Sequence, residues 1–145
     1  MDLVEIIGDS WGFTGLEPKS ILDVNDFGNV IVESDDGQVW HICPEELECN
    51  RIAGSTAEFE RVRASEDFVL DWKMERLVEL GRSIHGTPPE GRCFCLKIPG
   101  VLGGAYDGSN LGTISIAELL ASSGDLALQI KDLPDGTQVR LKVVD

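Results

Sequence analysis

The chain has 145 residues, of which 42% are hydrophobic and 26% are charged. This profile predicts one globular domain over residues 1–145 and excludes a disordered tail. With 26 acidic and 12 basic side chains, the formal net charge of -14 excludes nucleic acid and anionic membranes as direct partners. The same charge fits either plain solubility or attraction to a basic protein, and charge alone does not separate the two.

The sequence shows no sign of membrane insertion or export. No apolar run approaches the roughly 20 residues that a membrane-spanning helix needs. The first residues, MDLVEIIGDSWGF, are acidic where a signal peptide would be basic. We therefore expect a cytoplasmic protein.

The cysteines do not have the spacing of a zinc site. They form one C-x5-C and one C-x-C, whereas structural zinc is usually held by paired CxxC-like knuckles. We expect reduced, mostly buried thiols and neither a metal nor a cofactor. The four residues are Cys43, Cys49, Cys93 and Cys95.

The chain begins with a helical pattern. Hydrophobic residues recur at helical spacing over residues 3–13, and Gly12 or Gly15 can end the helix. We predict a short N-terminal helix within residues 1–15 that lays one apolar face on the domain.

A β-hairpin follows. Two β-rich runs at residues 30–33 and 38–43 flank the segment Ser34-Asp35-Asp36-Gly37, and Asp-Gly between such runs is a strong hairpin signal. In the second strand His41 shares a face with Val39 and Cys43. Because no nucleophile pattern accompanies it, His41 is interpreted as a packing or polar-face residue rather than a catalytic one.

An acidic segment follows the hairpin. Pro44 ends the strand, and Glu45, Glu46 and Glu48 surround Leu47. This segment is either a solvated loop or an electrostatic contact with a basic partner.

The middle of the chain predicts two helices. Ser55 and Glu58 form a capping box for a helix that reaches about residue 64. Ser65 can cap a second helix that ends by Gly86, with an apolar stripe and charged residues opposite. We expect this second helix to be the longest in the chain.

A glycine-rich segment over residues 97–110, KIPGVLGGAYDGSN, follows an alternating strand at residues 93–98. It is not a Walker loop, because no GK[ST] follows, and its glycine spacing does not match a dinucleotide fingerprint. Two interpretations stay open. The segment is a ligand or partner loop, or it is a structural turn in which three side chains plug the core: Val101, Leu102 and Tyr106.

The C-terminal third predicts helices and a last strand. Ser115 or Thr113 can cap a helix that is interrupted at residues 122–124, and Asp125 restarts a short helix. Alternation over residues 139–143 predicts a final strand. The whole pattern indicates an α+β fold with a mostly antiparallel sheet, an N-terminal hairpin, and helices packed mainly on one face.

Three segments together resemble a known family: DFGNVIVESDDGQVWHI, KIPGVLGGAYDGSNL and SGDLALQIKDLPDGTQVRLKV. They are similar to the C-terminal domain of immunity proteins that protect bacteria from type VI secreted DNase toxins, over roughly residues 11–145. The most specific positions are Leu102, Gly103, Gly104, Tyr106, Asn110, Gly124, Asp125, Leu126 and Gln129.

The resemblance implies a non-catalytic protein that binds and inhibits a cognate secreted toxin. An acidic surface suits a toxin whose active groove is basic because it holds DNA. On charge and expected exposure alone, we predict that the contacts include acidic residues at one end of the hairpin and, secondarily, residues of the glycine-rich segment. These candidates are Asp35, Asp36, Glu45, Glu46 and Glu48, then Tyr106, Asp107 and Asn110.

Two other classes of function are the alternatives. A small-molecule-sensing or regulatory module would use the glycine-rich segment at residues 100–110 to hold its ligand. An enzyme would need paired carboxylates, but the adjacent pairs, such as Asp35 with Asp36, point apart on a strand or helix. We therefore do not expect catalysis.

Overall fold

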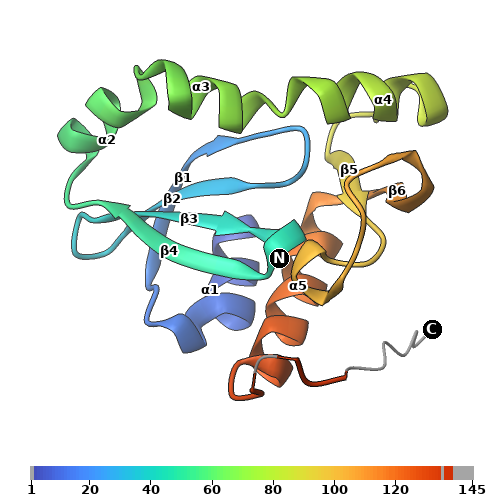
Figure 1. The fold of residues 1–145 in the computed structure, drawn as a ribbon. Coiled ribbons are helices and arrows are strands. Elements are labelled where there is room, and N and C mark those ends of the chain that lie inside the picture. The colour runs from blue at the N-terminus through green and yellow to red at the C-terminus, as the bar shows by residue number, and fades with distance from the viewer. Residues whose placement is uncertain (1, 135, 139–145) are drawn as a thin grey trace.

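The computed structural model describes residues 2–134 and 136–138. The chain folds into a four-stranded antiparallel sheet of order β1-β2-β3-β4, a two-stranded antiparallel sheet of β5 and β6, and the helices around them (Figure 1). The strands are β1 (Pro18–Val24), β2 (Val30–Ser34), β3 (Val39–Cys43), β4 (Glu48–Ala53), β5 (Arg92–Leu96) and β6 (Leu111–Ser115). The α-helices are α1 (Leu3–Trp11), α2 (Thr56–Arg63), α3 (Glu66–Lys73), α4 (Glu75–His85) and α5 (Ile116–Ile130).

The expected hairpin is confirmed as β2 and β3. Val30 pairs with Ile42 and Glu33 pairs with Val39, and Gly37 adopts φ 84° in the turn between them. The turn needs glycine because side chains disfavour this left-handed backbone region. The hairpin forms the middle of the four-stranded sheet.

Helices cover both faces of this sheet, whereas the sequence predicted them mainly on one face. Val30 and Ile42 pack with α1 and α5, while Ile31 and Val39 face the opposite side and pack with Phe59 of α2. The cause is visible in β2, where three consecutive residues, 30–32, are fully buried. A strand that is apolar on both faces needs cover on both.

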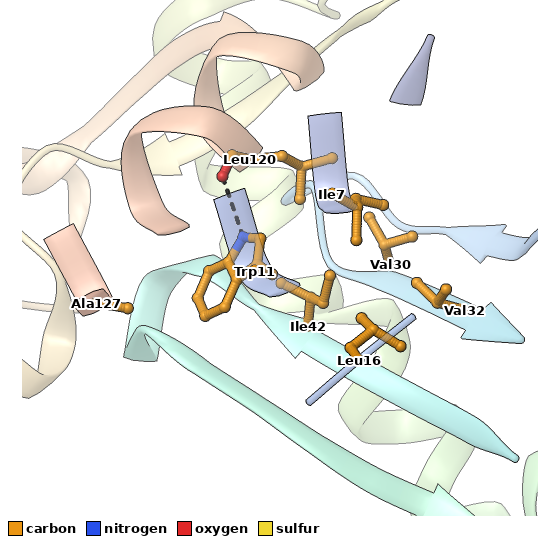
Figure 2. Packing of buried hydrophobic residues seen from close by; sticks show 8 residues of the cluster. All are labelled: Ile7, Trp11, Leu16, Val30, Val32, Ile42, Leu120 and Ala127. Carbon is orange, nitrogen blue, oxygen red and sulfur yellow. Dashed lines mark hydrogen bonds between the residues drawn. The ribbon is translucent and has the colours of Figure 1, made fainter. Parts of the chain in front are cut away.

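Helices α1 and α5 cross closely under the sheet. The Trp11 indole Nε1–H donates to the Leu120 carbonyl at 3.0 Å, and both side chains lie in the core with Ile7 (Figure 2). A Cβ atom on Gly124 would lie 2.5 Å from the Ser10 carbonyl oxygen, so the helices can approach this closely only with glycine there.

Helix α5 is continuous through the segment at residues 122–124, so the predicted interruption was wrong. The Ser123 hydroxyl donates to the Leu119 carbonyl inside the helix, and Gly124 meets α1. With 15 residues, α5 is also longer than either α3 or α4. Ser115 caps it as predicted, accepting from the Glu118 amide at 3.0 Å.

The long helix predicted to follow Ser65 is divided into α3 and α4. Met74 separates them in a left-handed conformation, with φ 45° and ψ 42°. The Asn25 amide donates to the Trp72 carbonyl at 2.9 Å and thereby satisfies a helix-end acceptor. The sequence has neither glycine nor proline at this break. The helical spacing of the apolar residues continues through it, and one continuous helix was therefore predicted.

The two-stranded sheet packs beside the first sheet. Phe94 of β5 donates its backbone N–H to the Asp26 carbonyl at 2.9 Å, and its ring lies 5.7 Å from that of Phe27. The glycine-rich segment leads into β6 before the chain enters the helix that the sequence predicted. Strands β1, β4 and β6 were not predicted. Strand β1 begins at a proline and shows no alternation of buried and exposed residues, β4 carries several exposed polar residues, and β6 contains Gly112 within only five residues.

The α+β class and the antiparallel sheet are confirmed. The predicted last strand at residues 139–143 lies outside the described residues. Within the described part of the chain, no helix combines the length and the apolar character that crossing a membrane requires.

Candidate functional site

The acidic candidates do not gather at one end of the hairpin, as the sequence suggested. Asp35 and Asp36 are exposed in the turn before β3, whereas Glu45, Glu46 and Glu48 follow its other end. The five residues of β3 separate the two groups by about 15 Å. The two groups therefore form separate surfaces.

Glu45 is buried, so the premise of exposure on which it was chosen was wrong. Only 8% of its surface is exposed, and both carboxylate oxygens accept from the Asn29 amide, at 3.0 and 2.8 Å. The Asn29 carbonyl oxygen in turn lies 2.7 Å from Nε2 of His41. Burial raises the pKa of Glu45 and lowers the pKa of His41. This chain of polar groups lies inside the molecule.

Asn110 is also buried, and it holds the glycine-rich segment together. Its side chain accepts from the Ile98 amide at 2.9 Å and donates to the carbonyls of Ile98, at 2.8 Å, and Ala105, at 3.0 Å. A side chain that satisfies three backbone groups inside a loop is a structural clamp. Asn110 therefore occupies the interior of the loop, where the alternative interpretation would have placed a ligand.

The glycines of the segment act in two different ways. Gly103 adopts φ 93° at the end of a 3₁₀ turn (Gly100–Leu102). Gly104 is needed for a close approach, because a Cβ atom there would lie 1.8 Å from the Ile98 carbonyl oxygen. The remaining motif residue, Asp125, accepts from the Gln129 amide at 2.9 Å on the surface of α5.

Two side chains expected to plug the core lie on the surface instead. Val101 is 54% exposed and Tyr106 is 43% exposed, while Leu102 is half-buried. The clamp by Asn110 explains the difference, because the loop is closed by hydrogen bonds and needs no apolar plug. Exposed apolar side chains held on an ordered loop are suited to contact with a partner.

One contact joins the two candidate segments. The Tyr106 hydroxyl donates to the Glu46 carboxylate, although the residues are 60 positions apart. Gly100 lies against this pair, since a Cβ atom there would meet both side chains. Burial and the bond to Glu46 raise the pKa of the Tyr106 hydroxyl. The structure thus brings Glu46 and Tyr106 to one place.

A groove lies beside this pair. Its volume is about 500 Å³, and it runs between the start of β4, the 3₁₀ turn at Gly100–Leu102 and the end of α5. We call it the acidic-rimmed groove, because Glu46 and Glu48 line it together with an apolar base. The apolar base comprises Trp11, Phe13, Leu47, Val101, Leu102, Ala127, Ile130 and Leu133.

The charge of the groove is negative among the described residues. Lys131 also lines it, but its ammonium pairs with the Asp132 carboxylate at 2.9 Å.

Sequence patterns did not point to Phe13 or Leu133 as functional residues. Phe13 fell inside the predicted helical pattern, whereas in the structure it lies in a 3₁₀ turn after α1 (Gly12–Thr14) and is 39% exposed.

The thiols are not poised for chemistry. Cys93 is buried and burial raises its pKa to about 12, and burial followed by the neighbouring Glu45 carboxylate raises the pKa of Cys43. Among the residues that the structure describes, no group of three or more histidine, cysteine, aspartate or glutamate side chains lies close enough together to hold a metal ion.

Comparison with solved structures finds a similar fold in Atu4351 from Agrobacterium tumefaciens, with a TM-score of 0.56 and 15% sequence identity. The match covers 84% of this chain and 62% of that protein, so the chain spans less than two thirds of its length. Comparison with curated proteins found no match.

A family model matches residues 53–127, just over half of the chain, and is described as "T6SS immunity protein Tdi1, C-terminal". The matched segment runs from the end of β4 into α5. It includes the glycine-rich segment with Tyr106 and Asn110, and also Gly124 of α5. The resemblance that the sequence suggested is thereby confirmed: the chain belongs to the family of type VI secretion immunity proteins that is defined by the C-terminal part of Tdi1.

Proposed function

We propose that this protein protects its host by binding a cognate type VI secreted toxin directly, without catalysis, and that the toxin is a nuclease with a basic active groove. Membership of the immunity family supports the protective role. The net charge of -14 supports a basic partner, because a strongly acidic surface accelerates the approach of a basic one.

The observation that carries the proposal is the junction of two candidate segments at the acidic-rimmed groove. Glu46 and Tyr106 meet at its edge, Glu48 lines its rim, and Val101 is an exposed member of its apolar base. Carboxylates around an exposed apolar base match the usual anatomy of an interface, with an apolar centre and a polar rim. The carboxylates would occupy places that DNA phosphates take in the toxin.

The turn residues Asp35 and Asp36 are a second, separate contact candidate. They are exposed, but the Ser34 hydroxyl donates to Asp36, and this bond is the main cause of the lowered pKa of that carboxyl. We assign them to long-range attraction, because rim charges act chiefly on association rate.

The test measures association of the full chain with the toxin encoded by the adjacent gene. Glu48→Lys is expected to slow association about tenfold at low salt and less at high salt, since screening weakens a rim charge. Val101→Asp is expected to speed dissociation, because it places a charge on the apolar base. Protection of cells that express the toxin should fall in both variants.

Leu70→Asp and Glu79→Lys are the matched controls. Both residues are exposed, on α3 and α4, and neither lines the acidic-rimmed groove. Association and protection equal to wild type in the two groove variants, with melting temperatures unchanged, would refute this surface. Failure of the wild-type chain to bind any adjacent toxin would refute the proposed function itself.

A further inference from the structure

A second cavity lies on the other face of the four-stranded sheet, under α2 and α3. Its volume is about 340 Å³, within the roughly 300–1,000 Å³ that is common for small-molecule sites. It shares the sheet face of Ile31 and Val39, whereas the acidic-rimmed groove is lined by Trp11 from the opposite face. Its lining includes Asn29, His41, Glu45, Phe68, Asp71 and Trp72.

Buried polar groups form part of the wall of this cavity. Asn29 and Glu45 are both more than nine-tenths buried, at 3% and 8% exposed. Because the Asn29 amide nitrogen donates to Glu45, its oxygen must accept from Nε2–H of His41 at 2.7 Å. This chain fixes the carboxylate in place. Besides Asn29, the neighbouring Cys43 thiol also donates to this carboxylate, so a bound cation would act on Glu45 through its charge rather than by filling an empty acceptor position.

The charged side chains that line the cavity are all acidic. Glu45 and Asp71 line it, and its lining includes neither lysine nor arginine. In the part of the chain that the structure describes, no basic side chain lies within ion-pair distance of Glu45. A buried carboxylate without a counter-charge is unfavourable, and a bound cation would supply that charge.

Aromatic rings form another part of the wall. Phe68 and Trp72 stack with their centroids 5.8 Å apart, and the His41 ring meets Trp72 edge-on at 5.8 Å. The faces of such rings attract cations through their quadrupole. Met74 adds a flexible thioether that can adapt to a ligand.

We propose that this cavity is a binding site for a small organic ammonium ion, with Glu45 as its anionic anchor, Trp72 and Phe68 as its aromatic wall and Asp71 at its exposed edge. The volume admits an amine with one small ring or a few methyl groups. Anionic ligands are disfavoured by both carboxylates. The site is independent of the toxin surface, because it lies across the sheet from it.

The test titrates phenethylamine and tetramethylammonium into the full chain, with heat of binding as the readout. The neutral isostere 2-phenylethanol is titrated in parallel. Saturable binding of at least one cation is expected, with binding at least about tenfold weaker for the alcohol. Glu45→Gln keeps the shape of the side chain and removes its charge, so it should weaken cation binding about tenfold and leave the alcohol unaffected.

Glu48→Gln is the control, because it removes one negative charge from an exposed position outside the cavity. It should bind the cations as wild type does. Equal cation affinity in Glu45→Gln and wild type, equal affinity for alcohol and amine, or no saturable binding of either cation would each overturn the proposal. A cooperative melt of Glu45→Gln confirms that any loss is not due to unfolding.

Discussion

Glu45 and Glu46 are neighbours in the sequence but lie in different environments. Glu45 points into the molecule and bonds with Asn29, whereas Glu46 faces the groove and accepts from Tyr106. Both lie in the 3₁₀ turn Pro44–Glu46, in which successive side chains point in different directions. A run of acidic residues in a sequence therefore does not show which of its side chains are exposed. The conformation of the turn determines which carboxylate a partner can reach.

The buried carboxyl of Glu45 predicts a pH-dependent stability. Because burial raises its pKa, the folded protein holds this proton more tightly than the unfolded chain does. Its contribution is most favourable below the unfolded pKa and is lost as pH rises through the folded pKa. Glu45→Gln should therefore gain melting temperature relative to wild type as pH rises from about 4 to about 8.

The measurement is a thermal melt followed by circular dichroism across that pH range. His41 is present in both proteins, so its own lowered pKa cancels in the difference to first order. A difference between Glu45→Gln and wild type that is constant with pH would contradict the assignment.

Gly103 and Gly104 predict different costs for the same substitution. Alanine at Gly104 meets the Ile98 carbonyl oxygen and should cost about 2–3 kcal/mol, as overpacking does. A Cβ atom at Gly103 meets no neighbour, so Gly103→Ala should lower the free energy of unfolding only through its positive φ, by about 1 kcal/mol. Urea unfolding of both variants measures the two costs, and a larger loss at Gly103 would show that conformation rather than space governs this loop.

At the scale of elements, the crossing of α1 and α5 depends on one small residue. Gly124→Ala places a Cβ atom 2.5 Å from the Ser10 carbonyl oxygen, so the helices must separate. We expect a loss of about 2–3 kcal/mol and a weaker bond from the Trp11 indole to Leu120. Gly12→Ala is the control, since nothing lies within 4 Å of the added atom. Equal stability of the two variants, measured by denaturant unfolding, would argue against a tight crossing.

Elements with strong local signals were predicted well. Asp-Gly between β-rich runs indicated the β2–β3 hairpin, and Ser55 and Ser115 mark the starts of α2 and α5. Prediction failed where a distant residue decides the outcome. Asn25 stabilises the break at Met74, and α1 gives the Gly124 segment a helical neighbour.

The candidate site was predicted only in part. Glu46, Glu48 and Tyr106 lie at the acidic-rimmed groove or its edge, but the meeting of Glu46 with Tyr106 depends on a loop closed by Asn110. Burial of Glu45 depends on Asn29 from another strand end. Such long-range contacts leave no periodic signal in the sequence.

At the scale of the whole molecule, the family-matched segment is not a structural unit. Helix α5 buries Leu120 and Ala127 against Trp11 and the inward side chains of β2 and β3, all of which precede residue 53 (Figure 2). A fragment of residues 53–127 would expose that face of α5. We expect the isolated fragment to lack a cooperative thermal transition, while the full chain melts cooperatively. A fragment that melts cooperatively would show that α5 finds other cover.

The division of the α2–α4 region by Met74 has a consequence for local opening. Helices α2 and α3 have eight residues each, fewer than the roughly 12–15 at which helices become stable alone in water. They persist because Phe59, Phe68 and Trp72 pack on the sheet, and the last two of these also line the cavity proposed for an ammonium ion. Their backbone amides should therefore exchange with deuterium sooner than those of α5, and an occupied cavity should slow that exchange in α3.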